Sequence, residues 1–116
     1  MTLHEIEEWA SHPLPEPYRL FLEDVPVERA VGEYVLLYGR ELFVDKNEQM
    51  ETKTYCPGFV TVGDDSGGRQ FILSLADGRV SLVDAGAMTP DCFYPVADDF
   101  GSWLSSGCRF DGDDES

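Results

Sequence analysis

The sequence predicts an α+β fold, with one antiparallel-rich mixed sheet packed by N-terminal and C-terminal helices. Apolar residues recur at helical spacing near both ends of the chain, and they alternate at strand spacing between residues 59 and 83. The predicted strands follow one another through short turns instead of alternating with helices, which favours antiparallel pairing. The length of 116 residues fits a single domain, which we place at residues 1–110.

Two helices are expected before Pro26. Thr2 and Glu5 have the spacing of a capping box, so the first helix should begin there and end before Pro13. The second helix begins in the segment 14–17, because proline is tolerated in a first helical turn. Its core-facing stripe consists of Leu14, Tyr18, Phe21, Leu22 and Val25.

The next segment combines a predicted loop, strand and helix. Residues 27–33 are expected to form a loop. The apolar run at 34–38 predicts a buried strand that ends at Gly39. Residues 40–50 alternate briefly but are rich in Glu, Lys and Gln, so we expect a short helix there.

A meander of three strands follows. The glycine-rich segment 63–68 is the predicted turn between the first two strands, since glycine readily adopts a positive φ. Asp77-Gly78 is a strong signal for the second hairpin. The strands themselves are expected at 59–62, 70–75 and 79–83.

The C-terminal part should hold one more helix. Residues 84–96 are rich in glycine and proline and are expected to form a loop. Asp98 is the predicted N-cap of a helix that ends near Gly107. Residues 111–116 hold four acids and are predicted to form a solvated, frayed tail. The apolar side of the helix carries Phe100, Trp103 and Leu104.

Charge limits the classes of function that we expect. Eight Lys and Arg residues stand against 23 Asp and Glu residues, which gives a net charge of −15. Residues 1–110 alone carry −11, since 19 of the acids lie there with all eight basic residues. Such a chain repels phosphate backbones and anionic lipid surfaces, so neither nucleic acid nor a membrane is an expected partner.

The sequence also indicates where the protein acts. No apolar run approaches the roughly 20 residues of a spanning helix, and the first residues lack the pattern of a secretory signal. Cys56, Cys92 and Cys108 are odd in number and widely spaced, which favours reduced thiols. We therefore expect a cytoplasmic protein whose cysteines serve as small, partly buried apolar residues.

The segment 63–68, GDDSGG, has several chemical interpretations. It is close to the GDSGG around a serine-protease nucleophile, but the extra Asp breaks the spacing, and the only histidines are His4 and His12. No Lys accompanies the glycines, as phosphate binding would require. Asp64 and Asp65 are candidate metal ligands without a calcium-loop pattern, and the competing interpretation is that they bond backbone N–H groups of the turn. We expect no catalytic residue, no metal and no cofactor.

Protein binding is the favoured use of this turn. Loops on a rigid sheet often carry recognition, and exposed tyrosines are frequent in binding hot spots. The alternative is that Gly67 and Gly68 only form the turn. The predicted partner-binding residues are Asp64, Asp65, Ser66 and Tyr55.

Three stretches carry a resemblance to a known family. They read LPxxYxxFL over residues 14–22, PGFVxVGDDxGG over 57–68 with a strand at Phe71, and ADxFxxWL over 97–104. In order and spacing they resemble the SUKH superfamily, which includes fungal regulators of cell-wall synthesis and bacterial immunity proteins against secreted toxins. The segment 23–27 departs from that pattern, because many relatives carry an Asn-Gly pair there.

The resemblance implies an α+β fold with a mixed sheet and a non-enzymatic, protein-binding function. The leading hypothesis is an immunity protein that neutralises a basic toxin domain, such as a nuclease, through its acidic surface. The alternative is a housekeeping regulator or scaffold of the same fold. A third hypothesis is a small hydrolase with a metal on Asp64 or Asp65. The identity of the partner and the oligomeric state are not predicted.

Overall fold

One sheet and a set of short helices make up residues 2–110, the part of the chain that the computed structural model describes. The helices are α1 (Leu3–Ala10), α2 (Glu16–Asp24), α3 (Phe43–Met50), α4 (Thr52–Tyr55) and α5 (Phe100–Ser105), with a 3-10 turn, η1, at Pro90–Cys92. The strands are β1 (Glu28–Val31), β2 (Val35–Tyr38), β3 (Phe59–Asp64), β4 (Arg69–Ser74), β5 (Val80–Asp84) and β6 (Tyr94–Ala97).

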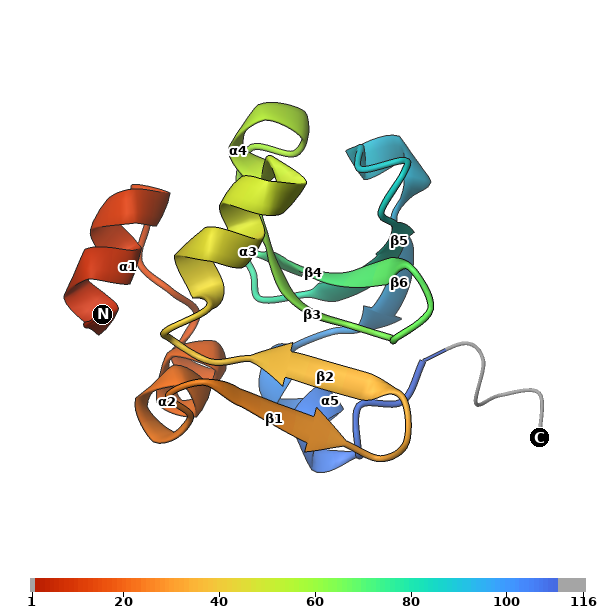
Figure 1. Cartoon of the computed structure of the whole chain (residues 1–116), viewed down its shortest axis with the longest axis horizontal. Helices are drawn as coiled ribbons and strands as arrows, with labels where there is room; N and C mark the ends of the chain where they lie inside the picture. Colours follow the sequence, from red (N-terminus) through yellow and green to blue (C-terminus); the bar gives the residue numbers. More distant parts are fainter. Residues whose placement is uncertain (1, 111–116) are drawn as a thin grey trace.

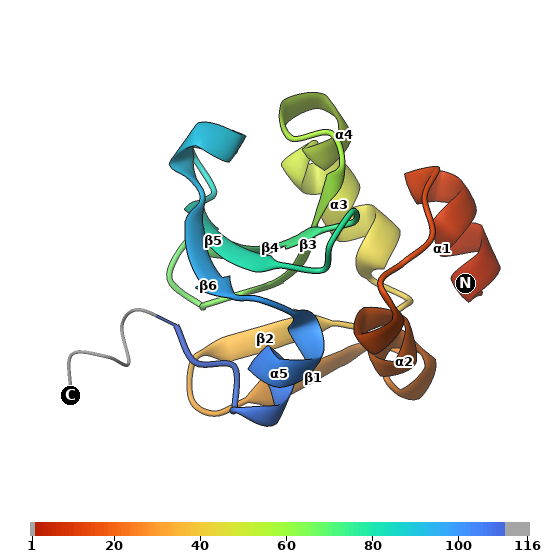
Figure 2. The ribbon, with the colours of Figure 1, turned by 180° about the vertical axis from the view of Figure 1, so that it is seen from behind.

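The six strands lie in the sheet in chain order, and each pairs with its neighbour in antiparallel orientation. The predicted α+β class is therefore confirmed, and across residues 2–110 the sheet is antiparallel throughout rather than mixed. Figures 1 and 2, which show the molecule from opposite sides, place α3 and α5 on opposite faces of the sheet. The two faces of the sheet are therefore covered by different helices.

The predicted loops at 27–33 and 84–96 are wrong in part, because each contains an edge strand. β1 is exposed at all but its last residue, so no apolar alternation marks it in the sequence. β6 contains Pro95, which cannot donate to a strand ladder but is tolerated at the edge of a sheet. Edge strands with polar residues or proline resist pairing with other chains. The same composition lacks the apolar alternation by which a strand is predicted from sequence.

Two shorter predictions also need correction, and one short helix has no prediction. The sequence pattern does not predict the single turn α4. Asp99, not Asp98, caps α5, because its Oδ1 accepts a hydrogen bond from the Ser102 N–H at 2.8 Å. Gly63 belongs to β3 instead of the turn, and a Cβ there would lie 2.5 Å from a carbonyl oxygen of β2. Glycine at this position permits the close approach of the two strands.

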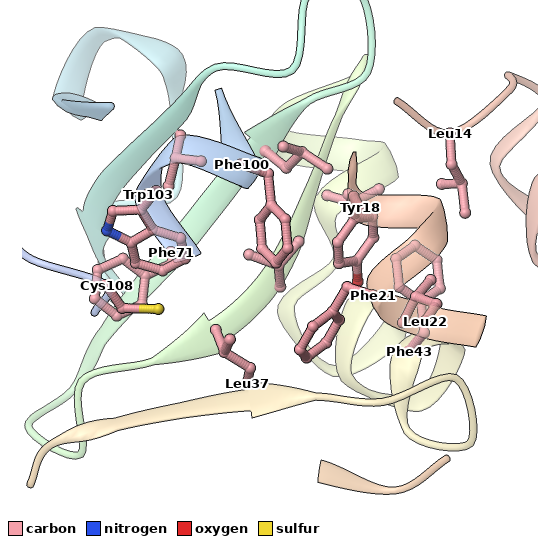
Figure 3. Close-up of a cluster of buried hydrophobic side chains, with 14 of the residues drawn as sticks. Leu14, Tyr18, Phe21, Leu22, Leu37, Phe43, Phe71, Phe100, Trp103 and Cys108 are labelled. Atoms are coloured by element: carbon pink, nitrogen blue, oxygen red, sulfur yellow. The ribbon is translucent and has the colours of Figure 1, made fainter. Parts of the chain in front are cut away.

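The main apolar core fills the space between the sheet and the helices α2 and α5 (Figure 3). Tyr18 of α2 and Phe100 of α5 meet edge to face with ring centroids 5.0 Å apart. Phe71 of β4 contacts Trp103 of α5, with ring centroids 4.7 Å apart. Such aromatic pairs contribute about 1 kcal/mol each beyond the area that they bury. The predicted stripe of the second helix is confirmed, since its members Leu14, Tyr18, Phe21, Leu22 and Val25 are all buried.

Alternation along β4 separates two apolar clusters. Phe71 and Leu73 belong to the main core, whereas Ile72 belongs to a smaller cluster. Polar Thr61 and Gln70 are also buried, and their side chains bond each other. The smaller cluster contains Cys56, Ile72, Val83 and Met88, with Met50, Phe59 and Phe93 packed against it. This second cluster joins the α3–α4 segment to the connection between β5 and β6.

Asn47 fastens α3 to β3. β2 pairs with β3 through only two residues, and the chain then turns away, so the backbone of Thr61 has no β2 residue opposite it. The Asn47 side chain takes that place: Oδ1 accepts from the Thr61 N–H at 2.8 Å, and Nδ2 donates to the Thr61 carbonyl at 3.1 Å. Nδ2 also donates to the Phe43 carbonyl at 2.9 Å, and Oδ1 accepts from the Thr52 hydroxyl at 2.8 Å. The carboxamide thus supplies the donor and the acceptor that a residue of β2 would otherwise offer to Thr61.

The substitution Asn47→Ala should lower the free energy of unfolding by about 2–4 kcal/mol. It removes four hydrogen bonds and leaves the buried N–H and C=O of Thr61 without partners. Urea denaturation of both proteins measures the difference.

Gln49→Ala, on the exposed side of the same helix, is the matched control and should change stability by less than about 0.5 kcal/mol. Equal effects of the two substitutions would show that Asn47 does not hold α3 to the sheet.

Candidate functional site

Asp65 holds the turn between β3 and β4 together. Its Oδ1 accepts hydrogen bonds from the Gly67 N–H at 2.8 Å and the Arg69 N–H at 3.1 Å, and its Oδ2 pairs with Arg69 Nε at 2.7 Å. Burial opposes the ionisation of Asp65, but these hydrogen bonds and the guanidinium outweigh it and hold the pKa of the carboxyl below its usual value. Both carboxylate oxygens are therefore committed to the turn itself.

Asp64 and Ser66 tie the turn to neighbouring parts of the sheet. Asp64 Oδ2 accepts a hydrogen bond from the Tyr38 hydroxyl at 2.8 Å, and Oδ1 accepts from the Ser66 N–H at 3.0 Å. The Ser66 hydroxyl donates to the Tyr34 carbonyl at 2.7 Å, which joins this turn to the turn between β1 and β2. Burial, together with the hydrogen bond to Asp64, raises the pKa of the Tyr38 phenol, so its proton stays available for donation.

The structure brings a different tyrosine to this turn from the one that we predicted. Tyr34, which the sequence pattern places in a buried strand, lies before β2 with 59% of its surface exposed. Tyr55 lies in α4, just before the start of β3, whereas Asp64 ends that strand (Figure 1). At about 3.3 Å per residue, β3 alone separates the two regions by roughly 17 Å. The predicted set thus divides into the β3–β4 turn and Tyr55.

Tyr55 belongs to a groove between α3–α4 and the connection from β5 to β6. The groove has a volume of about 420 Å³, which lies within the range of ligand-binding pockets. One wall consists of residues 49–51 with Tyr55, and the other consists of residues 85–89. Half of the surface of Tyr55 is exposed there. Figure 1 shows α4 and the segment that forms the opposite wall at the same end of the molecule.

Hydrogen bonds and ring contacts fix the wall at 85–89. The Ala85 N–H donates to the Gly68 carbonyl at 2.9 Å, and the Gly86 N–H donates to Asp84 Oδ1 at 2.8 Å. Phe93, which follows this wall, packs edge to face on Phe59 of β3 with ring centroids 5.0 Å apart. The thiol of Cys56 is buried in the same cluster, and burial raises its pKa. The groove therefore lies on a packed apolar base.

Glu51 adopts an unusual backbone conformation at the edge of the groove. It joins α3 to α4 with φ 53° and ψ 44°, in the left-handed region. A residue other than glycine is destabilised by roughly 1–2 kcal/mol there. Backbone strain of this kind often accompanies functional sites, and Glu51 and Tyr55 both line this groove.

The carboxylates do not assemble a metal centre within residues 2–110. No group of three His, Cys, Asp or Glu side chains in this part of the chain is arranged to hold a metal ion. Of the two histidines, His4 pairs with Glu8 at 3.4 Å, and His12 Nδ1 lies 2.7 Å from the Pro13 carbonyl oxygen. In the described chain, no helix has both the length and the apolar composition to span a membrane.

Sequence analysis missed Asn47, Glu51 and the apolar base of the groove. Glu51 gives no local signal, because a charged residue between two helices is ordinary. Met50 and Met88 lie 38 positions apart in the chain, and only the fold brings both to the groove. The signal for Tyr34 is present in the sequence, since Gly32, two residues before it, is typical of a turn.

No protein-family model matches the chain, and no curated protein matches it.

The substitution Asp65→Asn should lower the free energy of unfolding by about 2 kcal/mol at pH 7, because it removes the ion pair with Arg69 and weakens the hydrogen bonds of the turn. The folded-state pKa of Asp65 lies below its unfolded value, so this stabilisation is complete above about pH 4 and is lost as the pH falls through the folded pKa. Denaturation series at several pH values should show the two proteins converging in acid.

Asp98→Asn, at an exposed carboxylate, removes the same charge and is the control. A loss of stability that is equal in the two variants, or independent of pH, would contradict the role of Asp65.

Proposed function

We propose that this protein is a non-enzymatic, cytoplasmic protein-binding domain of the SUKH type, and that it acts as an immunity protein. Its acidic surface binds a basic toxin domain in a one-to-one complex, and a nuclease, whose substrate channel must be cationic, is the toxin class that fits best. The motif resemblance across residues 14–104 and the free thiols of Cys56, Cys92 and Cys108 support this proposal.

One observation carries the proposal: the positive charges are committed within the molecule, and many negative charges are not. Seven of the eight basic side chains contact a carboxylate, a backbone carbonyl or an aromatic ring, namely Arg19, Arg29, Arg40, Lys46, Lys53, Arg69 and Arg79. Exposed carboxylates that form no ion pair with a basic side chain of the described residues are Glu16, Glu28, Glu33, Asp45, Glu51, Asp84, Asp91 and Asp98.

These carboxylates lie on several helices, strands and loops, so they produce a broad negative field. Such a field accelerates the encounter with a cationic protein, and salt screens it. The field alone does not define a contact surface. Specific binding therefore needs a shaped site within the acidic surface, and the groove beside Tyr55 is a shaped site that combines an exposed aromatic ring with a carboxylate and has no basic lining residue.

Co-expression with the products of the neighbouring reading frames tests the proposal, because immunity proteins are usually encoded beside their toxins. We expect one of these products to arrest growth alone and to be neutralised in a one-to-one complex. The association rate should fall by about tenfold or more between roughly 50 and 300 mM salt, while the dissociation rate changes little.

The triple variant Glu16→Gln, Glu28→Gln and Asp45→Asn should slow association several-fold, because it removes three charges outside the groove. Thr54→Ala with Ser105→Ala, at exposed neutral positions, is the control and should leave the rate unchanged. Growth arrest that this protein does not relieve, with no complex at low salt, would contradict the immunity function and favour a regulator or scaffold with weak partners.

A further inference from the structure

We propose that the groove beside Tyr55 receives an arginine side chain of the partner protein. This inference rests on the proposed function, since it names the chemistry of the contact that the acidic domain makes. In this proposal the groove makes the specific contact with the partner. The rest of the acidic surface attracts the partner from a distance.

The walls of the groove match the parts of an arginine side chain. Glu51 supplies a carboxylate that no basic residue of the described chain neutralises, and guanidinium pairs with carboxylate through two parallel hydrogen bonds. Tyr55 supplies an exposed ring on which the planar guanidinium can stack. Met50 and Met88 supply apolar, adaptable surface for the methylene stem.

Charge selects the class of occupant. The lining residues of the groove include Glu51 and no Lys, Arg or His. The nearest basic residue along the chain, Lys53, is directed elsewhere, because its Nζ lies 4.1 Å above the centre of the Trp9 ring. An anionic ligand would meet an acidic wall on a protein of net charge −15, and it is therefore disfavoured.

Arginine is preferred to lysine because of the groups that face the groove. Lysine carries a compact, strongly hydrated charge without a flat face, whereas the guanidinium is planar and weakly hydrated, so it both stacks on the ring and pairs with a carboxylate through two hydrogen bonds. The volume of about 420 Å³ also admits a long side chain together with some of its flanking backbone. Arginine is, in addition, enriched at protein interfaces and among their hot spots.

Binding should require little rearrangement. Asn47 and Thr52 fix the α3–α4 wall to β3, and the Phe59–Phe93 contact holds the opposite wall. A site whose walls are fixed before binding loses less conformational entropy when it is occupied.

The test uses a blocked Gly-Arg-Gly peptide as the probe, with the citrulline and lysine peptides for comparison, in ¹⁵N NMR titrations at low salt. Citrulline has nearly the shape of arginine without its charge. We expect chemical-shift changes concentrated at Tyr55 and residues 85–89, and affinity for the arginine peptide about five- to tenfold above that for either comparison peptide. Shifts spread over the whole acidic surface, or equal affinity for arginine and lysine, would overturn the proposal.

Three variants separate binding from folding. Glu51→Gln should abolish the preference for arginine over citrulline, whereas Glu28→Gln, which removes one charge from the distant strand β1, should keep it. Glu51→Gly should raise the melting temperature, because glycine relieves the left-handed strain, and should still lose the preference. An unchanged preference in both Glu51 variants would show that the carboxylate is not part of a site.

The same variants distinguish this inference from the proposed function. A toxin domain that is neutralised as well by Glu51→Gln as by the unmodified protein would contradict the groove alone. A groove that prefers the arginine peptide in a protein that binds no neighbouring gene product would contradict the immunity function alone.

Discussion

The two hydrogen bonds between the Asn47 side chain and the backbone of Thr61 are the constraint on which the rest of the structure depends. An antiparallel sheet must satisfy every buried N–H and C=O group, and β2 ends before it can pair with Thr61. A carboxamide can replace one peptide group because it offers a donor and an acceptor side by side. The residue that completes the sheet lies on a helix, so α3 and the following α4 are placed by hydrogen bonds as well as by apolar packing.

This arrangement explains why a groove persists at one end of the molecule. The main core is continuous, since α2 and α5 contribute interlocking aromatic rings to it. The smaller cluster contains only a few apolar residues, and α3–α4 and the β5–β6 connection reach it from two sides. Because Asn47 holds one side and Phe93 holds the other, the two do not close on each other. The hollow between them carries Tyr55 and the strained Glu51.

Local signals predicted most of the fold and little of the site. The Thr2–Glu5 capping box and the stripe of the second helix are set by residues a few positions apart, and both are present. The edge strands β1 and β6 lack alternation because solvent covers much of them, so their pairing depends on neighbours that no local window contains. The predicted site rests on the expected exposure of loop residues, and it joins Tyr55 to Asp64 although a whole strand separates them. The groove depends on contacts between residues 49–55 and 85–89, which sequence spacing does not report.

Hydrogen exchange at the amide of Thr61 tests the central claim most directly. If Asn47 completes the sheet, this amide opens only when the domain unfolds, and its protection should equal that of the most protected amides of β4. Exchange as fast as that of an exposed amide in β1 would mean that α3 is not fastened to β3. The groove would then have no fixed wall, and Asn47 would not be the residue that completes the sheet.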